Sequence, residues 1–139
     1  MNNKRVLTLI EIMSKLSGFK TICDDAGNEY VVYDSNSIKS ITGIRDKTEF
    51  EALENHVHIL EHVRKKEFEM LCGMAPVFCD ALLSRLSRRF PEKEFIVYVS
   101  VSLNDSMIIR FHQKWPGEVR YYDPELFTDP AERVFLAEN

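Results

Sequence analysis

The stretch EFIVYVSVSLNDSMIIRFHQK, residues 94–114, limits the possible folds of this chain more than any other feature. Its two halves are rich in β-branched and aromatic residues, and a polar turn signal at 104–106 separates them. This pattern predicts a β-hairpin. Alternate residues on both sides of the turn are apolar, so one face of the hairpin should pack against the core. The inward-facing residues are Phe95, Val97, Val99, Val101 and Leu103 before the turn, and Met107, Ile109 and Phe111 after it.

The length of the turn decides how the two strands pair. A two-residue loop at 104–105 would place Ser102 opposite Met107 and would mix polar and apolar residues on one face. A three-residue loop at 104–106 keeps the apolar residues together, and we predict it because strand register follows the buried face. The predicted inward pairs are Leu103 with Met107, Val101 with Ile109 and Val99 with Phe111, and the outward pairs are Tyr98 with His112 and Ser100 with Arg110.

The N-terminal third of the chain predicts one helix and one hairpin. Apolar residues recur at helical spacing over residues 4–17 and Gly18 follows, which favours an amphipathic helix. Residues 19–34 hold two runs rich in β-branched and aromatic residues around a turn-rich centre at 24–28, so a β-hairpin is expected there. Residues 35–44 fit either a third strand or an ordered loop.

The middle of the chain predicts an αα-hairpin. Thr48 and Glu51 have the spacing of a capping box, which indicates the start of a long helix that Gly73 would end. Pro76 fits the first turn of a further helix over 76–89. Two helices joined by so short a connection are expected to pack antiparallel.

Weaker signals complete the chain. Residues 119–123 fit another strand, and Asp129 followed by Pro130 predicts the cap and first turn of a short closing helix. No repeat, low-complexity tract or linker interrupts residues 1–139. We therefore predict a single α+β domain, in which the αα-hairpin and the N-terminal helix pack on one face of a largely antiparallel sheet.

The segment ENHVHILEH, residues 54–62, contains three of the four histidines. On the predicted helix, Glu54, His58 and His62 are four residues apart and share one face, a spacing that can chelate zinc. A helical wheel places this face away from the apolar stripe, and a structural zinc would need a fourth ligand. The pattern favours a solvated helix face over a metal site or a partner-binding surface, so we expect no metal and no cofactor.

The acidic excess of the chain lies at its C-terminal end. The sequence has 18 basic and 22 acidic residues, and the net charge of −4 comes entirely from residues 115–139. This distribution argues against a nucleic-acid partner, because phosphate binding needs clustered Lys and Arg. It fits a basic protein partner or a solubilising tail. The candidate binding residues in this region are Asp123, Glu125 and Asp129.

The outward face of the 95–114 hairpin is a second candidate for binding. Tyr98, Arg110 and His112 would lie on it, with Trp115 nearby. Arg, Tyr and Trp are the residue types that dominate binding hot spots. The alternative is an ordinary solvated face, since an antiparallel sheet commonly shows one polar face to water.

The sequence carries few signs of catalysis. It has no Gly-rich phosphate loop, no HExxH, no G-x-S-x-G and no EF-hand loop, and no activated nucleophile accompanies His112. We therefore expect no catalytic residue. Three cysteines without a C-x-x-C pattern indicate reduced thiols, and no apolar run reaches the roughly 18 residues of a membrane span. A cytoplasmic location without membrane contact is expected.

These features lead to two hypotheses about function. The first is a small cytoplasmic protein-binding module, such as a bacterial immunity or antitoxin-type inhibitor that occludes a basic toxin or effector. The second is a small-ligand-binding protein or an enzyme without a local motif, with a pocket between sheet and helices and with His112, Tyr98 and Arg110 at its mouth. A broad acidic or aromatic surface favours the first hypothesis, whereas a concave apolar pocket favours the second.

Overall fold

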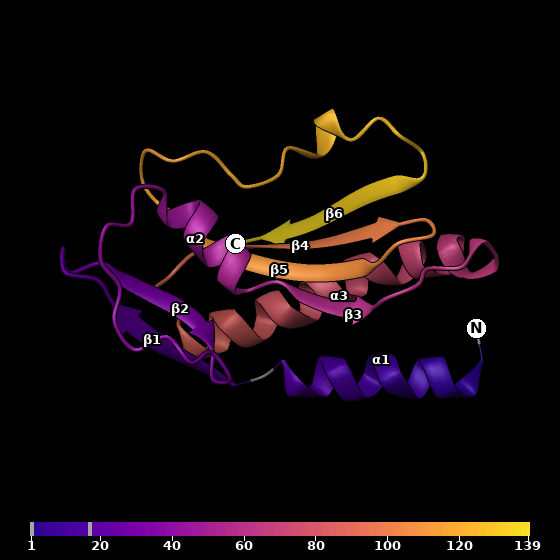
Figure 1. The fold of residues 1–139 in the computed structure, drawn as a ribbon, viewed down its shortest axis with the longest axis horizontal. Helices are drawn as coiled ribbons and strands as arrows, with labels where there is room; N and C mark the ends of the chain where they lie inside the picture. Colours follow the sequence, from indigo (N-terminus) through magenta and orange to yellow (C-terminus); the bar gives the residue numbers. More distant parts are fainter. Residues whose placement is uncertain (1, 17) are drawn as a thin grey trace.

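The computed structural model describes residues 2–16 and 18–139, which form both helices and strands (Figure 1). The first half contains α1 (Asn3–Lys15), β1 (Phe19–Cys23), β2 (Glu29–Tyr33), α2 (Lys47–Glu54) and β3 (Val57–Leu60). The second half contains α3 (Phe68–Arg89), β4 (Phe95–Ser102), β5 (Met107–Gln113) and β6 (Glu132–Glu138), with short 3-10 turns η1 (Lys65–Glu67) and η2 (Pro124–Leu126).

The strands form two antiparallel sheets. One sheet has the order β3-β5-β4-β6, and the other contains β1 and β2, as the predicted N-terminal hairpin requires. α3 packs against β4 and β6 on one face of the larger sheet. α1 adds Leu9 and Met13 to the same core, and Leu16 follows directly after the helix. The protein is one compact α+β domain, which confirms the predicted fold class. The predicted last residue of the N-terminal helix, 17, lies outside the described residues.

The β4–β5 hairpin has the predicted facing but a different register. Its inward residues are all buried in the main core, apart from Leu103, which is half-buried. The observed pairs are Val101 with Met107 and Val99 with Ile109, two residues away from the predicted ones. The loop is 103–105 rather than 104–106: Ser102 N–H donates to Ser106 O (3.1 Å), and Asn104 takes a positive φ of 61°. A shift of two residues keeps every side chain on its predicted face.

Val99 and Ser100 test this facing directly. Val99→Ala removes buried methyl groups from the core, so we expect the free energy of unfolding to fall by about 1–3 kcal/mol. Ser100→Ala changes the opposite face and removes only one hydroxyl, so its cost should be well below that of Val99→Ala. Urea denaturation of both variants gives the comparison, and equal costs would show that the facing assignment is wrong.

The predicted αα-hairpin is wrong. α2 ends at Glu54, and Val57–Leu60 forms β3, which pairs with β5. β3 pairs with β5 at the edge of the sheet, and this pairing buries Ile59 and Leu60. The free energy gained by this burial outweighs the local preference for a helix. α3 then continues through Gly73 and Pro76, both of which lie on its exposed side.

Among the described residues, Lys65–Arg89 is long and apolar enough to cross a membrane by length and composition, but α3 packs on the sheet and core helices pass the same test. The predicted closing helix is wrong, because Glu132–Glu138 forms β6 and pairs with β4. Residues 119–123 form no strand, and 35–44 form a loop with one isolated bridge at Ile41.

Candidate functional site

A long connection between β5 and β6, residues 114–131, crosses the sheet face opposite α3 (Figure 1). We call it the β5–β6 connection. It contains the predicted site residues Trp115, Asp123, Glu125 and Asp129. Apart from the short turn η2, it has no regular structure of its own, so its side chains must hold it on the domain. They do so at four places.

The first attachment is a hydrogen-bond chain through His112. His112 Nδ1 faces the carbonyl of Gln113 at 2.7 Å and therefore carries the proton, which leaves Nε2 as an acceptor. Nε2 accepts from Tyr98 Oη (2.9 Å) and from the backbone N–H of Tyr121 (3.3 Å). Burial lowers the pKa of His112 and raises the pKa of Tyr98 to about 12, so both side chains stay neutral.

The second attachment is the stacking of Arg110 against two tyrosines of the connection. Its guanidinium lies 4.8 Å from the ring centre of Tyr121 and 5.2 Å from that of Tyr122. Nη1 donates to the carbonyl of Ala52 (3.2 Å), in the last turn of α2, where a cation complements the helix dipole. Arg110 is only 7% exposed, so it links β5, α2 and the β5–β6 connection inside the protein.

The third attachment is the fully buried carboxylate of Glu51. Oε1 accepts from Gln113 N–H (2.8 Å) and from the indole N–H of Trp115 (2.7 Å). Oε2 accepts from Val31 N–H (2.9 Å) and Gln113 Nε2 (2.8 Å). One side chain thus links α2 to β2, β5 and the connection. Burial raises the pKa of Glu51 to about 7, although all four donors favour the charged form.

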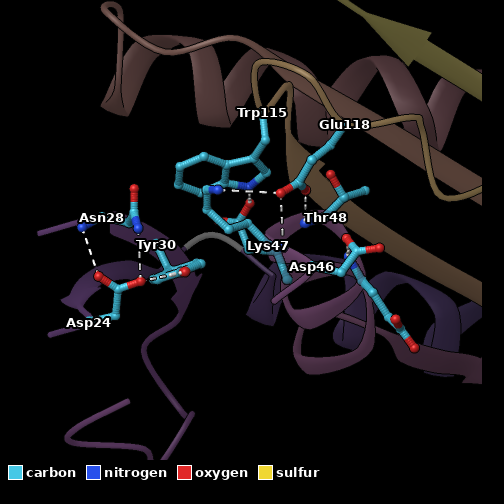
Figure 2. Close-up of polar contacts among 10 residues, drawn as sticks. Asp24, Asn28, Tyr30, Asp46, Lys47, Thr48, Trp115 and Glu118 are labelled. Carbon is cyan, nitrogen blue, oxygen red and sulfur yellow. Dashed lines mark hydrogen bonds and ion pairs between the residues drawn. The ribbon is translucent and has the colours of Figure 1, made fainter. Parts of the chain in front are cut away.

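The fourth attachment is Glu118 at the N-terminus of α2 (Figure 2). Its carboxylate accepts from the backbone N–H groups of Thr48 (2.7 Å) and Lys47 (3.2 Å), and it pairs with Lys47 Nζ at 3.4 Å. Burial alone would raise its pKa, but the hydrogen bonds from Thr48 and Lys47 outweigh burial and hold the pKa below its usual range. A carboxylate at this position satisfies free N–H groups and complements the helix dipole.

The predicted capping box at the start of α2 is therefore wrong. Asp46 is the N-cap and accepts from Glu49 N–H (2.9 Å), while Glu51 turns inward. Thr48 makes its helix-start contact with Glu118, which comes from a distant part of the chain. Spacing alone could not reveal this, because the capping group lies 70 residues away.

The β1–β2 turn supports the site from the other side. Asp24 accepts from Asn28 Nδ2 (2.9 Å), from backbone N–H groups of the turn and from Tyr30 Oη (2.7 Å), as Figure 2 shows. The hydrogen bond from Asn28 is the largest cause that lowers the pKa of Asp24, to about 2. Tyr30 is thereby fixed against the ring of Trp115, with ring centres 5.2 Å apart.

The outer surface of the β5–β6 connection is apolar and acidic. Val119 is 85% exposed and Leu126 is 77% exposed, the highest values among the large apolar side chains described. Asp123, Glu125 and Asp129 are also exposed, and the described residues form no ion pair with them. An open depression between these side chains is lined by Val119, Arg120, Tyr121, Asp123, Glu125 and Leu126.

Comparison with known proteins places this arrangement in a family. Residues 19–138 match the family described as "Uncharacterized protein PM0498 family". The chain belongs to this family. No curated protein and no solved structure gives a significant match. The matched range of the PM0498 family runs from β1 into β6, so it includes the whole β5–β6 connection and leaves out α1.

The PM0498-family fold separates the predicted site residues into two groups. Tyr98, Arg110 and His112 lie together but are buried beneath the connection, so the expected exposed polar face is wrong. Trp115 is half-buried at the Glu51 attachment, and the three acidic residues are exposed on the outer surface. Sequence reasoning missed Glu51 and Glu118 as attachments, and Val119 and Leu126 as exposed apolar side chains.

The histidine-rich segment does not form the predicted helix face. His58 lies in β3 and His56 precedes it, with ring centres 5.6 Å apart, while His62 follows the strand. His58 Nδ1 lies 3.6 Å from a carboxylate oxygen of Glu61. The described residues contain no group of three or more His, Cys, Asp or Glu side chains arranged to hold a metal ion. Cys72 and Cys79 are buried free thiols in the core.

The buried side chains of Glu51 and His112 predict opposing effects of pH on stability. Because the pKa of Glu51 is raised in the folded state, its contribution is fully present below pH 4.5 and is lost as pH rises through about 7. Because the pKa of His112 is lowered, its contribution is present above about 6.5 and is lost as pH falls. Between these limits the two slopes have opposite signs in the wild-type protein, so each partly offsets the other.

A variant that removes one of these two groups should show the pH dependence of stability that the other group causes. His112→Gln should become more stable as the pH falls from 7 to 5, and Glu51→Gln should become less stable over the same range. The measurement is the free energy of unfolding from urea denaturation at several pH values. Parallel pH profiles of the two variants would contradict the assignment.

Proposed function

We propose that this PM0498-family protein is a small cytoplasmic protein-binding module that occupies the surface of a basic partner through its β5–β6 connection. An immunity or antitoxin-type inhibitor, which occludes a basic toxin or effector, is the form of this function that we favour. One observation carries the proposal. A segment held at four places by buried and partly buried side chains presents Val119 and Leu126 to solvent beside three exposed acidic residues that form no ion pair with the described residues.

Two physical features support binding by this surface. Exposed apolar side chains rimmed by charge are typical of interaction sites, since their burial against a partner releases water. The attachments through Trp115 and Glu118 reduce the conformational entropy that the connection would lose on binding. The acidic rim would accelerate encounter with a basic surface, and the apolar residues would slow dissociation.

The second hypothesis, a small-ligand protein, is favoured by one cavity at the edge of this site. The cavity has a volume of about 260 Å³ and is lined by His112, Trp115, Lys114 and Arg120 among others. However, both ring nitrogens of His112 are used inside the protein, and Arg110 is buried. The exposed outer surface therefore supports protein binding better than chemistry at these residues.

Comparative affinity capture tests the proposal. Wild-type protein, the triple variant Asp123→Asn/Glu125→Gln/Asp129→Asn and a control are used to capture proteins from lysate of the native host, followed by mass spectrometry. The control, Glu11→Gln/Asp80→Asn/Glu92→Gln, neutralises three acidic residues that are also exposed but lie outside the connection. A basic protein retained by wild type and control but depleted with the triple variant is expected. Equal recovery by all three proteins would contradict the role of the connection.

A further inference from the structure

The larger sheet has two outer strands, β3 and β6, and their free edges differ. β3 has four residues, its pairing with β5 is interrupted by a register shift, and α1 lies beside it (Figure 1). Short strands, irregular pairing and a covering element are means by which native proteins prevent a sheet edge from pairing with another chain. β6 instead has seven residues that pair with β4 in one unbroken register, and no described strand pairs with its other side.

The pairing with β4 shows which backbone groups of β6 are free. Leu103 N–H donates to Ala131 O (2.8 Å) at the start of this ladder. Hydrogen-bonded and non-hydrogen-bonded pairs alternate along an antiparallel ladder, so the backbone groups of Val134, Leu136 and Glu138 point away from β4. The turn η2 contacts β6, but no hydrogen bond between described residues uses these backbone groups.

The side chains of β6 suit pairing with a further strand. Between its two terminal glutamates the strand has one charged residue, Arg133, and α3 holds this side chain. Arg133 pairs with Glu69 at 2.9 Å and lies 5.2 Å from the ring centre of Phe68. Residues 133–137 are all half-buried, so each keeps some contact with solvent. A long, regular and mainly apolar edge strand is a template on which another strand can pair.

We propose that β6 is a dimer interface, at which the β6 strands of two copies of this chain pair antiparallel about a two-fold axis. The alternating donors and acceptors of the edge match a second copy of themselves in this arrangement. A register centred on Leu136 pairs it with the partner's Leu136 and pairs Val134 with the partner's Glu138, which uses every free backbone group of the edge. A register centred on Phe135 would place Glu132 opposite the partner's Glu138, and like charges in that position are unfavourable.

The dimer would join the two larger sheets into one continuous sheet. Because the two-fold axis of such a pairing runs perpendicular to the sheet, both β5–β6 connections would lie on the same face. Dimerisation uses backbone atoms of β6, whereas the proposed binding residues lie in the connection. Either property can therefore be present without the other.

Sedimentation velocity of the full chain over a range of concentrations tests the pairing. Wild type should shift from monomer to dimer as the concentration rises. Val134→Pro should weaken the dimer by about tenfold or more, because proline lacks the N–H that each copy donates to the other. This N–H makes no bond to β4, so the variant should still fold, and urea denaturation checks it. Val134→Ala keeps the N–H and should weaken the dimer much less.

A pair of cysteine variants tests the register. Both carry Cys23→Ser, which removes the exposed thiol. Under mild oxidation Leu136→Cys should form a disulfide between the two copies, because residues directly opposite each other have Cα atoms about 5.5 Å apart. Val134→Cys should not, since its two copies would lie about 14 Å apart along the strands. Non-reducing gel electrophoresis measures the yield.

Three results would each overturn the proposal. The first is a wild-type protein that stays monomeric at every concentration. The second is equal dimer affinity of Val134→Pro and Val134→Ala. The third is equal disulfide formation by Leu136→Cys and Val134→Cys.

Discussion

Replacing Glu51 by glutamine should lower the free energy of unfolding by about 2–4 kcal/mol at pH 7, although the two side chains have nearly the same shape. The carboxylate accepts four hydrogen bonds, two at each oxygen. A glutamine amide turns one acceptor into an NH₂ group, which leaves two buried donors without partners at about 1–3 kcal/mol each. Relief of the buried charge offsets part of this cost.

The Glu51→Gln variant should also change the structure around residue 51. Since Glu51 joins β2, β5 and Trp115, the variant should loosen the start of the β5–β6 connection and change the fluorescence of the single tryptophan. Glu49→Gln, at an exposed position of the same helix, is the matched control and should change stability by a few tenths of a kcal/mol. Stability of Glu51→Gln equal to or above that of wild type would refute the role assigned to the carboxylate.

The β4–β5 hairpin could be predicted from the sequence because its alternation is long and unambiguous. Its register could not, since pairings that differ by two residues bury the same side chains. The turn decides between these two registers. There Asn104 adopts a left-handed conformation, and the N–H of Ser102 donates a hydrogen bond to the carbonyl of Ser106.

Residues 47–73 were mispredicted because local and tertiary preferences disagree there. Leu53, Val57 and Leu60 have helical spacing, but Val57–Leu60 gains more by pairing with β5 as an edge strand. The same applies to the C-terminal end, where Asp129-Pro130 imitates a helix start and Glu132–Glu138 completes the sheet beside β4. Strand pairing depends on distant residues, which a local pattern does not contain.

The candidate site could be predicted only in part. Composition pointed to the acidic residues of the connection, which are exposed as an interface requires. The polar residues of the hairpin were expected to face water, but the tyrosines of the connection cover them. A polar sheet face can be buried when most of its groups find partners. Some of the partners of Arg110 and His112 lie in a segment that has no regular structure.

Neutralising Asp123, Glu125 and Asp129 together should slow association with a captured basic partner by about tenfold at low salt. Charges at the rim of an interface act on the rate of encounter, and salt screens them over about 8 Å at physiological ionic strength. Dissociation depends more on buried apolar contacts, so Val119→Ser/Leu126→Ser should mainly raise the dissociation rate. The two variants thus separate the electrostatic and apolar contributions of the connection.

The most direct measurement of the central claim is the association rate of wild type, the triple variant and the control Glu11→Gln/Asp80→Asn/Glu92→Gln across a series of salt concentrations. The rates come from surface plasmon resonance with the captured partner. We expect a steep salt dependence for wild type and control and a nearly flat one for the triple variant, with rates that converge at high salt. Association of the triple variant at the wild-type rate in low salt would contradict binding through the connection, and tight, salt-sensitive binding of the protein to DNA or RNA would contradict a protein partner.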